Sequence, residues 1–320
     1  MHYTSIPGIT KPISRLGQGC MMLKDGDGLA ASFAMLDAAF AQGVTCYDHS
    51  YVYGGGACER AFGKWLSTRG NRDRIVILDK GCHHNGDRKR VTPFDIAHDI
   101  ADSLARLKVS SIDLWCFHRD DPSQPVGPLI EELNRQRDAG RINAFGASNW
   151  TTARLAEAQA FAQAHGLTGF VCTSPNFSLA EQVAEPWPDC LTISGPDHAA
   201  DRAWLSKTGL TAFTWSSLAR GFLSGRITRA NAEAMRGQVE EHVFRCYATE
   251  ANFTRLDRLH DLAAKKQCTV AQLALAFVLR QDFPTVALVA AYNEAEAIAN
   301  AGALDIPLTA QEAAWLDLRG

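Results

Sequence analysis

The chain has 320 residues, of which 46% are hydrophobic and 21% are charged, and its formal net charge is −3. These values are typical of a globular protein, and the nearly balanced charge disfavours a nucleic-acid-binding surface. No run of about 18 apolar residues occurs, and residues 1–15 lack the apolar stretch of a secretory signal. We therefore expect a cytoplasmic protein that binds neither nucleic acid nor a membrane.

Nine cysteines are scattered singly between Cys20 and Cys268, and none forms a C-x-x-C pair. The odd count and the irregular spacing disfavour both a disulfide framework and a zinc site. We expect these cysteines to act as small buried hydrophobes in a reducing compartment. The adjacent His83 and His84 do not predict a metal site either, because neighbouring side chains of a strand point to opposite faces and no spaced third ligand follows.

Helices that end at glycine recur along the chain. Between residues 29 and 42, apolar side chains lie at helical spacing, and Gly43 follows as a stop. Thr92, followed by proline, predicts the start of a further helix. The segments Thr269–Gln272 and Thr309–Glu312 fit the capping box that begins a helix. Further glycine stops are expected at Gly70, Gly140, Gly166 and Gly209.

Short apolar runs alternate with these helices and predict strands. They lie near residues 16–20, 44–48, 74–80, 111–118, 143–149, 169–174, 211–215 and 285–290. Alternating strands and helices imply right-handed crossovers and a parallel sheet. Because eight such units occur without a linker, we expect an α/β protein with one domain over residues 1–320, a closed (β/α)₈ barrel of the TIM type.

Two segments lie outside this regular pattern. Residues 1–15 precede the first unit, and we expect them to form a small hairpin below the barrel. The polar stretch 221–248 is expected to be an irregular loop beside the seventh strand, and long loops at such places are often functional. Extra helices are expected at the C-terminus.

Polar residues close several of the predicted strands. Asp48, Lys80 and His118 each stand at the end of an apolar run, and Tyr53 follows the second strand in a loop. In a parallel barrel these strand ends form one rim, where catalytic residues from several strands gather. The four side chains are therefore expected to converge at one mouth.

This set of groups suits hydride transfer to a carbonyl. The reaction builds negative charge on oxygen, and this charge requires an acid and local dipoles. Tyr53 would donate the proton, and a neighbouring Lys80 ammonium would lower the phenol pKa from its usual value of about 10. Asp48 would keep Lys80 charged, and His118 would bind the carbonyl oxygen. Structural alternatives remain open, since a strand-end Asp or His is often a cap or a core group and Lys80 could pair with Asp79.

At several points the sequence resembles the aldo-keto reductase superfamily. The segments that carry the resemblance occur in the family's usual order: YDHSYVYGGGACERAFGKWL, LDKG, DLWCFHRDD, GASNW, WSSLARGFLSG and AQLALAFVL. The resemblance implies Asp48, Tyr53, Lys80 and His118 as the catalytic tetrad of an NAD(P)H-dependent carbonyl reductase. It also implies a set of residues around the cofactor. These are Ser148 and Asn149 at the carboxamide, Trp215 against the nicotinamide ring, and Ser216, Leu218, Arg220 and Gly221 around the pyrophosphate.

Three departures from the family pattern affect the cofactor site. Asp79 stands where the family usually has threonine, and Ser174 stands where a glutamine usually helps to hold the carboxamide. In the segment that resembles the adenosine-phosphate site, Asn300 matches the asparagine that contacts adenine. The customary basic or hydroxyl residues of that segment are replaced by Ala290, Ala291, Tyr292 and Glu296. A 2′-phosphate prefers cations, and these replacements provide none. The resemblance to the family favours NADP(H), but the replacements leave only a narrow preference over NAD(H).

The substrate is expected to be a small carbonyl compound. Polar and aromatic residues just beyond the strand ends are expected to line its pocket: His49, His83, His84, Arg119, Asp120 and Trp150. Such a lining suits a hydroxylated aldehyde or a sugar-like ligand. Two alternatives stay open, a sugar or alcohol dehydrogenase working in the oxidising direction and a non-catalytic nucleotide-binding regulatory subunit. The protein is expected to be a monomer or a small homo-oligomer.

Overall fold

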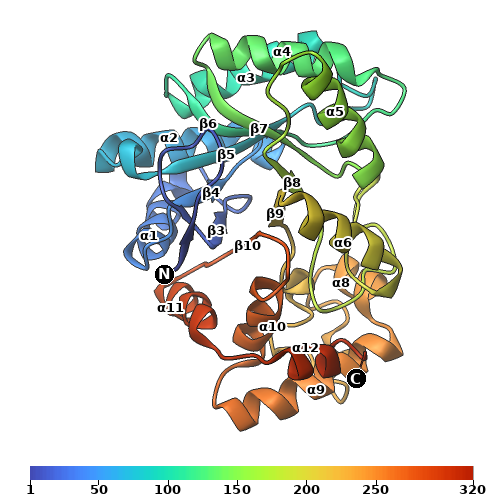
Figure 1. Ribbon diagram of the computed structural model, residues 1–320. Helices are drawn as coiled ribbons and strands as arrows, with labels where there is room; N and C mark the ends of the chain where they lie inside the picture. The colour runs from blue at the N-terminus through green and yellow to red at the C-terminus, as the bar shows by residue number, and fades with distance from the viewer. Residues whose placement is uncertain (320) are drawn as a thin grey trace. The chain divides into compact units, whose positions relative to one another are not determined.

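The computed structural model describes residues 1–319, and the chain divides into two compact units. The first unit contains Met1–Ser174 and Ala290–Ala297, and the second contains Pro175–Val289 and the chain from Ile298 onward. Figure 1 labels most of the helices and strands of both units. Among the described residues no single helix is long and apolar enough to cross a membrane, although the bent pair formed by helices 250–266 and 270–279 meets that test of length and composition.

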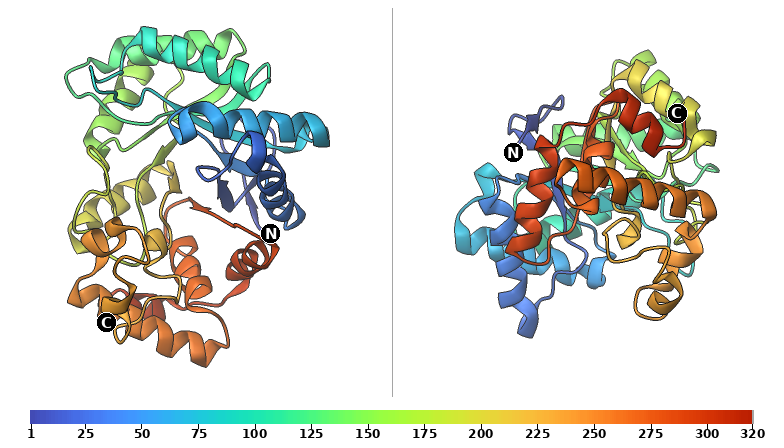
Figure 2. Two further views of the ribbon diagram at one scale, coloured as in Figure 1. Left: turned by 180° about the vertical axis from the view of Figure 1, so that it is seen from behind. Right: turned by 90° about the horizontal axis from the view of Figure 1, so that it is seen from below.

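The first unit contains eight strands and five complete helices. The strands are β1 Tyr3–Thr4, β2 Ile13–Ser14, β3 Leu16–Gly19, β4 Cys46–Asp48, β5 Val76–Gly81, β6 Ile112–Phe117, β7 Ile142–Ser148 and β8 Cys172–Ser174. The helices are α1 Leu29–Ala41, α2 Ala57–Arg69, α3 Pro93–Leu107, α4 Val126–Asp138 and α5 Thr152–Ala164. Strands β3 to β8 pair in parallel in chain order, and α1 to α5 pack neighbour against neighbour in the same order (Figures 1 and 2). The antiparallel pair β1–β2 confirms the predicted N-terminal hairpin.

The second unit contains the last two strands, which are parallel, and most of the C-terminal helices. Its strands are β9 Thr211–Thr214 and β10 Thr285–Val289. Its helices are α6 Ala199–Thr208, α7 Ala232–Met235, α8 Glu241–Tyr247, α9 Glu250–Lys266, α10 Val270–Leu279 and α12 Ala310–Leu316. Helix α11 Glu294–Gly302 begins in the first unit and ends in the second. The stretch 221–248 is more ordered than predicted, because α7 and α8 lie within it.

The strand order is that of a closed barrel, β10-β3-β4-β5-β6-β7-β8-β9, which confirms the predicted (β/α)₈ fold. All eight predicted strands are present. The helix signals are confirmed too, since Thr92 accepts a hydrogen bond from the Asp95 amide and both predicted capping boxes form. The five expected glycine stops all have φ between 59° and 82°, in the left-handed region that glycine tolerates.

Strand alternation in the first unit determines which side chains share a face of the sheet. Every residue of β5 and β6 is buried, as expected when both faces of parallel strands are covered. The register aligns Lys80 with Cys116, then Gly146, then Cys172. The Cys116 and Cys172 sulfur atoms lie 3.6 Å apart, and a Cβ on Gly146 would come within 2.4 Å of the Cys172 sulfur. Gly146 therefore leaves space for two thiols beneath the strand ends.

The same alternation extends this face to the ends of the strands. Successive side chains point to opposite faces, so residues two positions apart share one. His118 lies two residues beyond Cys116, Ser148 two beyond Gly146, and Ser174 two beyond Cys172. Asp48 is aligned with Leu78, which lies two residues before Lys80. These polar side chains therefore lie on one face at the carboxyl ends of β4 to β8.

Candidate active site

The four predicted catalytic residues all belong to the first unit, and the contacts bring them together. The Lys80 ammonium is hydrogen-bonded to Asp48 Oδ1, and its Nζ lies 3.5 Å from the Tyr53 hydroxyl. The Tyr53 and His118 rings meet edge to face with centroids 5.9 Å apart. Asp48, Lys80 and His118 are at most 8% exposed. A carboxylate, an ammonium, a phenol and an imidazole thus form one cluster.

A glycine-rich turn carries Tyr53 to this cluster. Residues 53–56 form a single tight turn before α2, and Gly54, Gly55 and Gly56 all have positive φ, at 60°, 57° and 83°. Residues with a Cβ adopt such angles only at a cost, so the three glycines set the path of the chain after Tyr53. The GGG motif therefore determines the path of the loop that follows Tyr53.

An arginine on α3 holds this loop from behind. The Arg106 guanidinium lies 4.9 Å from the centroid of the Tyr51 ring, and its Nε donates to Glu59 Oε2 over 2.5 Å. A Cβ on Gly56 would lie 2.6 Å from Arg106 Cδ, so the arginine occupies the space that the glycine leaves. Sequence reasoning missed Arg106, because nothing in its local pattern links α3 to a loop some 50 residues earlier.

Burial dominates the electrostatics of the cluster. It raises the pKa of Asp48 above its ordinary value even though the Lys80 ammonium acts in the opposite direction. Burial alone would lower the pKa of Lys80, but the charge of Asp48 and its hydrogen bond to the ammonium act in the opposite direction, and the pKa is raised. Lys80 therefore stays protonated although its side chain is buried.

Tyr53 is held as a neutral phenol. Burial raises its pKa above the usual range, Asp48 adds to the rise, and Lys80 and Arg119 oppose it. Lys80 acts in the predicted direction, but the prediction of a net lowered tyrosine pKa is wrong because desolvation outweighs the ammonium. A neutral phenol can donate a proton, and the neighbouring ammonium would stabilise the tyrosinate that remains.

His118 is connected to the cluster through a serine. Ser50 Oγ lies 2.9 Å from His118 Nδ1 and donates to the Lys80 carbonyl oxygen, also over 2.9 Å. Burial lowers the pKa of His118 well below its ordinary value, and the charges of Lys80 and Arg119 lower it further. His118 is therefore neutral near neutral pH. Ser50 was not predicted, although it stands two residues after Asp48, the spacing that places a strand residue on the same face.

The residues predicted to hold a carboxamide form a polar group on β7 and β8. Ser148 Oγ donates to the Ser174 carbonyl oxygen over 2.6 Å, and Asn149 Nδ2 lies 3.0 Å from both the His118 carbonyl oxygen and Ser148 Oγ. Within residues 1–319, the buried Ser174 hydroxyl has no hydrogen-bond partner. Buried polar groups normally have partners, so this hydroxyl suits a ligand with its own donors and acceptors, as the amide of a nicotinamide has. The residues present fit the cofactor that the sequence implies.

The predicted pyrophosphate loop lies in the second unit and has an unusual backbone. Ser216 and Arg220 have φ of 54°, in the left-handed region, and the Gly221 amide donates to the Leu218 carbonyl oxygen. Successive residues of this kind can turn several amides toward an anion. Arg220 is paired with Glu240 and its guanidinium lies 4.4 Å from the Trp187 ring centroid. Trp215 carries an indole N–H that is buried and has no partner within the described residues.

The predicted adenosine segment is fixed to β3 and capped by its own carboxylate. Gln18 Oε1 accepts from the Ala291 amide over 3.2 Å. Glu296 accepts from the Tyr292 amide over 2.9 Å, while its own amide donates to Asn293. Tyr292 is exposed, and Asn300 follows on α11 in the second unit. The Glu296 carboxylate is thus part of the helix start.

Two of the six predicted substrate residues are placed in packing positions, and a third lies in an ion pair. His49 is fully buried against the Phe62 ring of α2, with centroids 4.1 Å apart, because it alternates with Asp48 and faces the helices. Trp150 stacks on Phe117 at 5.1 Å, on the helix side of β6. For these two residues the prediction of a substrate wall is wrong.

The third of these residues is Asp120. Its carboxylate lies 3.4 Å from Arg154 Nε, and both side chains are about 10% exposed. Its carbonyl oxygen accepts from His84 Nε2 over 3.0 Å. Asp120 therefore takes part in an ion pair and a turn, and its place in the substrate wall stays a prediction.

The other three predicted substrate residues lie beside the tetrad. The His83 ring packs edge to face against His118 with centroids 4.8 Å apart, and the His84 ring adjoins His83 at 6.5 Å. Arg119 Nη1 donates to the His118 carbonyl oxygen, and its charge acts on the pKa of both Tyr53 and His118. This side of the cluster is polar and rich in imidazole.

Comparisons with known proteins find similar sequences over nearly the whole chain. The sequence profile described as "Aldo/keto reductase family" matches residues 15–318. The chain is 27% identical to "Aldo-keto reductase YhdN" and 26% identical to "Uncharacterized oxidoreductase YrpG", both from Bacillus subtilis (strain 168), over 301 residues in each case. These alignments cover 90% of this chain and 84% and 86% of the two relatives.

Two further similarities extend the comparison. A "Probable voltage-gated potassium channel subunit beta" from Oryza sativa subsp. japonica is 26% identical over 289 residues, which cover 87% of this chain and 84% of that protein. The solved structure of the glycerol dehydrogenase AKR11B4 from Gluconobacter oxydans matches with a TM-score of 0.77 and 22% identity, covering 99% of this chain and 94% of that one. This structural match supports the fold.

Proposed function

The chain belongs to the aldo/keto reductase family, and from this premise we propose that it reduces an aldehyde or ketone to the alcohol with NAD(P)H. Tyr53 is the proposed proton donor, and the substrate class is a sugar-like or otherwise hydroxylated carbonyl compound. The single observation that carries the proposal is the position of the Lys80 ammonium, which contacts the Asp48 carboxylate and lies 3.5 Å from the Tyr53 hydroxyl.

This arrangement gives each residue a defined part in the reaction. When bound, the nicotinamide cofactor supplies a hydride to the carbonyl carbon. As negative charge develops on the carbonyl oxygen, the Tyr53 hydroxyl donates its proton to that oxygen, and the Lys80 ammonium stabilises the tyrosinate that remains. Asp48 keeps Lys80 protonated, and the burial of these two side chains shields their ion pair from competing water. In the oxidising direction the same groups run in reverse, with tyrosinate as the base.

A conservative substitution tests the role of Tyr53. In Tyr53→Phe we expect kcat with NAD(P)H and a carbonyl substrate to fall by about 10²–10⁴-fold, the usual contribution of a positioned general acid. Nucleotide affinity, measured by fluorescence titration, is expected to stay within about twofold, since the phenol is proposed to act on the carbonyl. Tyr51→Phe is the matched control, because Tyr51 is exposed and keeps its ring against Arg106 after the change. A Tyr53→Phe enzyme with wild-type kcat would overturn the assignment.

For the cofactor we propose NADP(H), narrowly ahead of NAD(H). The family resemblance supports the 2′-phosphate, whereas the segment 290–300 contains no Lys or Arg and presents the Glu296 carboxylate at the start of α11. Titration of NADPH and NADH side by side tests this preference. A lower Kd for NADPH supports it, and equal affinities would mean that the 2′-phosphate is not recognised.

A non-catalytic nucleotide-binding role is the alternative from another class, and one relative carries the name of a channel subunit. The cluster of Asp48, Tyr53, Lys80 and His118 favours catalysis, because binding alone does not require four coupled groups. Turnover with a panel of aldoses and simple aldehydes separates the two roles. Nucleotide binding without turnover of any of them would favour the regulatory role.

A further inference from the structure

The hydroxyl of Ser50 lies between two groups that compete for its single proton. It is 2.9 Å from the Lys80 carbonyl oxygen and 2.9 Å from His118 Nδ1, and the Ser50 side chain is fully buried. A carbonyl oxygen can only accept a hydrogen bond, whereas an imidazole nitrogen either donates or accepts according to its tautomer. The carbonyl therefore determines how the proton is distributed.

The end of β4 explains why the Lys80 carbonyl needs this proton. The His49 amide donates to the Leu78 carbonyl oxygen over 2.8 Å, as the last step of the β4–β5 ladder. Strand β4 ends at Asp48, and the Ser50 hydroxyl takes the place of a backbone amide opposite Lys80, two residues further along β5. A buried carbonyl without a donor costs about 1–3 kcal/mol, so the hydroxyl proton stays on this bond.

The proton count then fixes the tautomer of His118. Because the Ser50 hydroxyl donates its hydrogen bond to the Lys80 carbonyl oxygen, Ser50 Oγ can only accept a hydrogen bond from His118. His118 Nδ1 therefore carries a hydrogen. Burial and the nearby charges of Lys80 and Arg119 keep the ring neutral by lowering its pKa. In a neutral ring with Nδ1 protonated, Nε2 has a lone pair and no hydrogen. Such a nitrogen cannot donate to a carbonyl oxygen, which is the role expected of His118 from the sequence.

His83 repeats the same arrangement next to His118. Its Nδ1 lies 2.7 Å from the His84 carbonyl oxygen and must donate to it. Burial lowers the pKa of His83 too, so its Nε2 is an acceptor as well. Because the His83 and His118 rings are in edge-to-face contact, two imidazole acceptors lie side by side next to Tyr53.

We propose that Ser50 is a positioning residue that fixes His118 with Nδ1 protonated, and that His118 Nε2 accepts a hydrogen bond from a hydroxyl group on the carbon next to the reacting carbonyl. The preferred substrate class is therefore the α-hydroxy aldehydes and α-hydroxy ketones, because their hydroxyl supplies the donor that this nitrogen needs. The reacting oxygen itself is left to Tyr53. This inference rests on the proposed carbonyl reduction and adds a determinant of specificity to it.

The tautomer can be measured without any activity. In protein labelled with ¹⁵N-histidine, a two-bond ¹H–¹⁵N correlation spectrum distinguishes protonated from unprotonated ring nitrogens, and His118→Asn identifies the His118 signals. Near neutral pH we expect Nδ1 of His118 to be protonated and Nε2 to be unprotonated. Protonated Nε2 in the wild-type enzyme would overturn the inference whatever the enzyme's substrate.

A matched pair of ketones tests the specificity. Hydroxyacetone and 2-butanone have nearly the same shape, but only the first has a hydroxyl next to the carbonyl. We expect Ser50→Ala to lower the ratio of kcat/KM for hydroxyacetone over 2-butanone by about three- to tenfold, the effect of one hydrogen bond. The change should fall mainly on KM for hydroxyacetone and should accompany a gain of protonated Nε2 in the spectrum. If the alanine variant is unstable, Ser50→Cys provides a similar volume with a weaker donor.

Ser178→Ala is the control for removal of a buried serine hydroxyl, since Ser178 Oγ donates to the Ala180 carbonyl oxygen in the second unit. It should leave the ketone ratio unchanged. An equal ratio in wild type and Ser50→Ala, with both ketones reduced, would overturn the specificity role while the proposed reductase function stands. Absence of turnover with these ketones and with the aldehyde panel would instead overturn the reductase function and the substrate assignment together, and the spectrum would still report the tautomer.

Discussion

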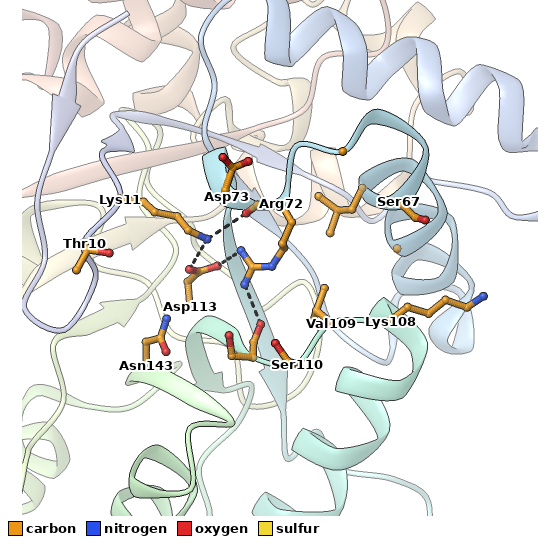
Figure 3. A pocket seen from close by; sticks show the side chains of 14 residues that line it. Thr10, Lys11, Ser67, Arg72, Asp73, Lys108, Val109, Ser110, Asp113 and Asn143 are labelled. Carbon is orange, nitrogen blue, oxygen red and sulfur yellow. Dashed lines mark hydrogen bonds and ion pairs between the residues drawn. The ribbon is translucent and has the colours of Figure 1, made fainter.

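The first unit holds buried charge at both ends of its parallel strands, and the two ends differ in how that charge is satisfied. At the amino ends, a pocket of about 740 Å³ is lined in part by Lys11, Arg72 and Asp113, which point toward one another (Figure 3). Asp113 accepts from Lys11 Nζ and Arg72 Nη1, each over 2.8 Å, and from the Ile77 amide over 2.9 Å. Its carboxylate has three donors from three segments of the chain.

Lys11 and Arg72 are equally well paired. Lys11 Nζ also donates to the carbonyl oxygens of Arg72 and Ile75, and Arg72 Nη2 donates to the Ser111 carbonyl oxygen. These bonds join the N-terminal segment to the turn before β5 and to the start of β6. The cluster of Lys11, Arg72 and Asp113 therefore has a structural role, because it holds these segments of the chain together.

At the carboxyl ends, the buried cation has fewer partners than Lys11 has. Lys80 contacts Asp48 and Tyr53, while within the described residues the Ser174 hydroxyl has no partner. Burial shifts the pKa values of Asp48, Tyr53 and His118. Perturbed groups of this kind gather at functional sites, and in barrel enzymes the carboxyl ends carry the chemistry while the opposite end serves stability. The comparison teaches that the number of hydrogen-bond partners of a buried polar group, more than its charge, marks the site.

The largest expected effect comes from neutralising the cation of the carboxyl ends. In Lys80→Met we expect kcat to fall by roughly 10²–10⁴-fold, because no ammonium remains to stabilise the tyrosinate. Asp48 then takes up a proton, since its pKa is already raised by burial and loses the opposing effect of Lys80. Steady-state assays with a saturating nucleotide measure the loss. An unchanged kcat would show that Lys80 has only a structural role.

Neutralising the carboxylate of the amino ends should act on stability alone. In Asp113→Asn the two cations lose their common partner, and we expect the free energy of unfolding to fall by roughly 2–4 kcal/mol, below the cost for fully buried pairs because Lys11 and Arg72 are partly exposed. Denaturant unfolding measures this change. A drop in kcat/KM at a temperature where the variant is fully folded would contradict the division between the two ends.

A smaller effect is expected from His49, the buried histidine that packs against Phe62 of α2. Burial lowers the pKa of His49 from 6.5 to about 3, so the folded chain keeps this ring neutral while the unfolded chain protonates it. Its contribution to stability is complete above about pH 6.5 and is lost as the pH falls toward 3. At pH 5 the loss amounts to about 2 kcal/mol. His49→Gln should therefore flatten the acid side of the stability profile relative to wild type, as measured by denaturant unfolding between pH 7 and pH 5, and parallel profiles would refute this.

Much of the first unit could be predicted from the sequence because its signals are local. The strand-end residues Asp48, Lys80 and His118 were found by position alone, and helix starts such as Thr92 satisfy their caps within a few residues. The face of the sheet on which a given side chain lies was harder to predict. His49 and Trp150 adjoin strand-end residues, yet they pack against Phe62 and Phe117.

Contacts between distant segments could not be read from local pattern. Ser50 acts through a carbonyl 30 residues away, and Arg106 through a glutamate 47 residues away. Neither residue type is unusual at its position, and only the folded arrangement shows which acceptor or which ring it meets. The raised pKa of Tyr53 was missed for a similar reason, because desolvation depends on all of the surrounding chain.

The rate of hydride transfer in a single turnover, compared between Lys80→Met and Asp113→Asn, tests the central claim most directly. Each variant removes one member of an ion pair, and the two pairs lie at opposite ends of the parallel strands. We predict a rate at least about 100-fold below wild type for Lys80→Met and a rate within about twofold of wild type for folded Asp113→Asn. Equal losses in the two variants, or a fast Lys80→Met enzyme, would contradict the account.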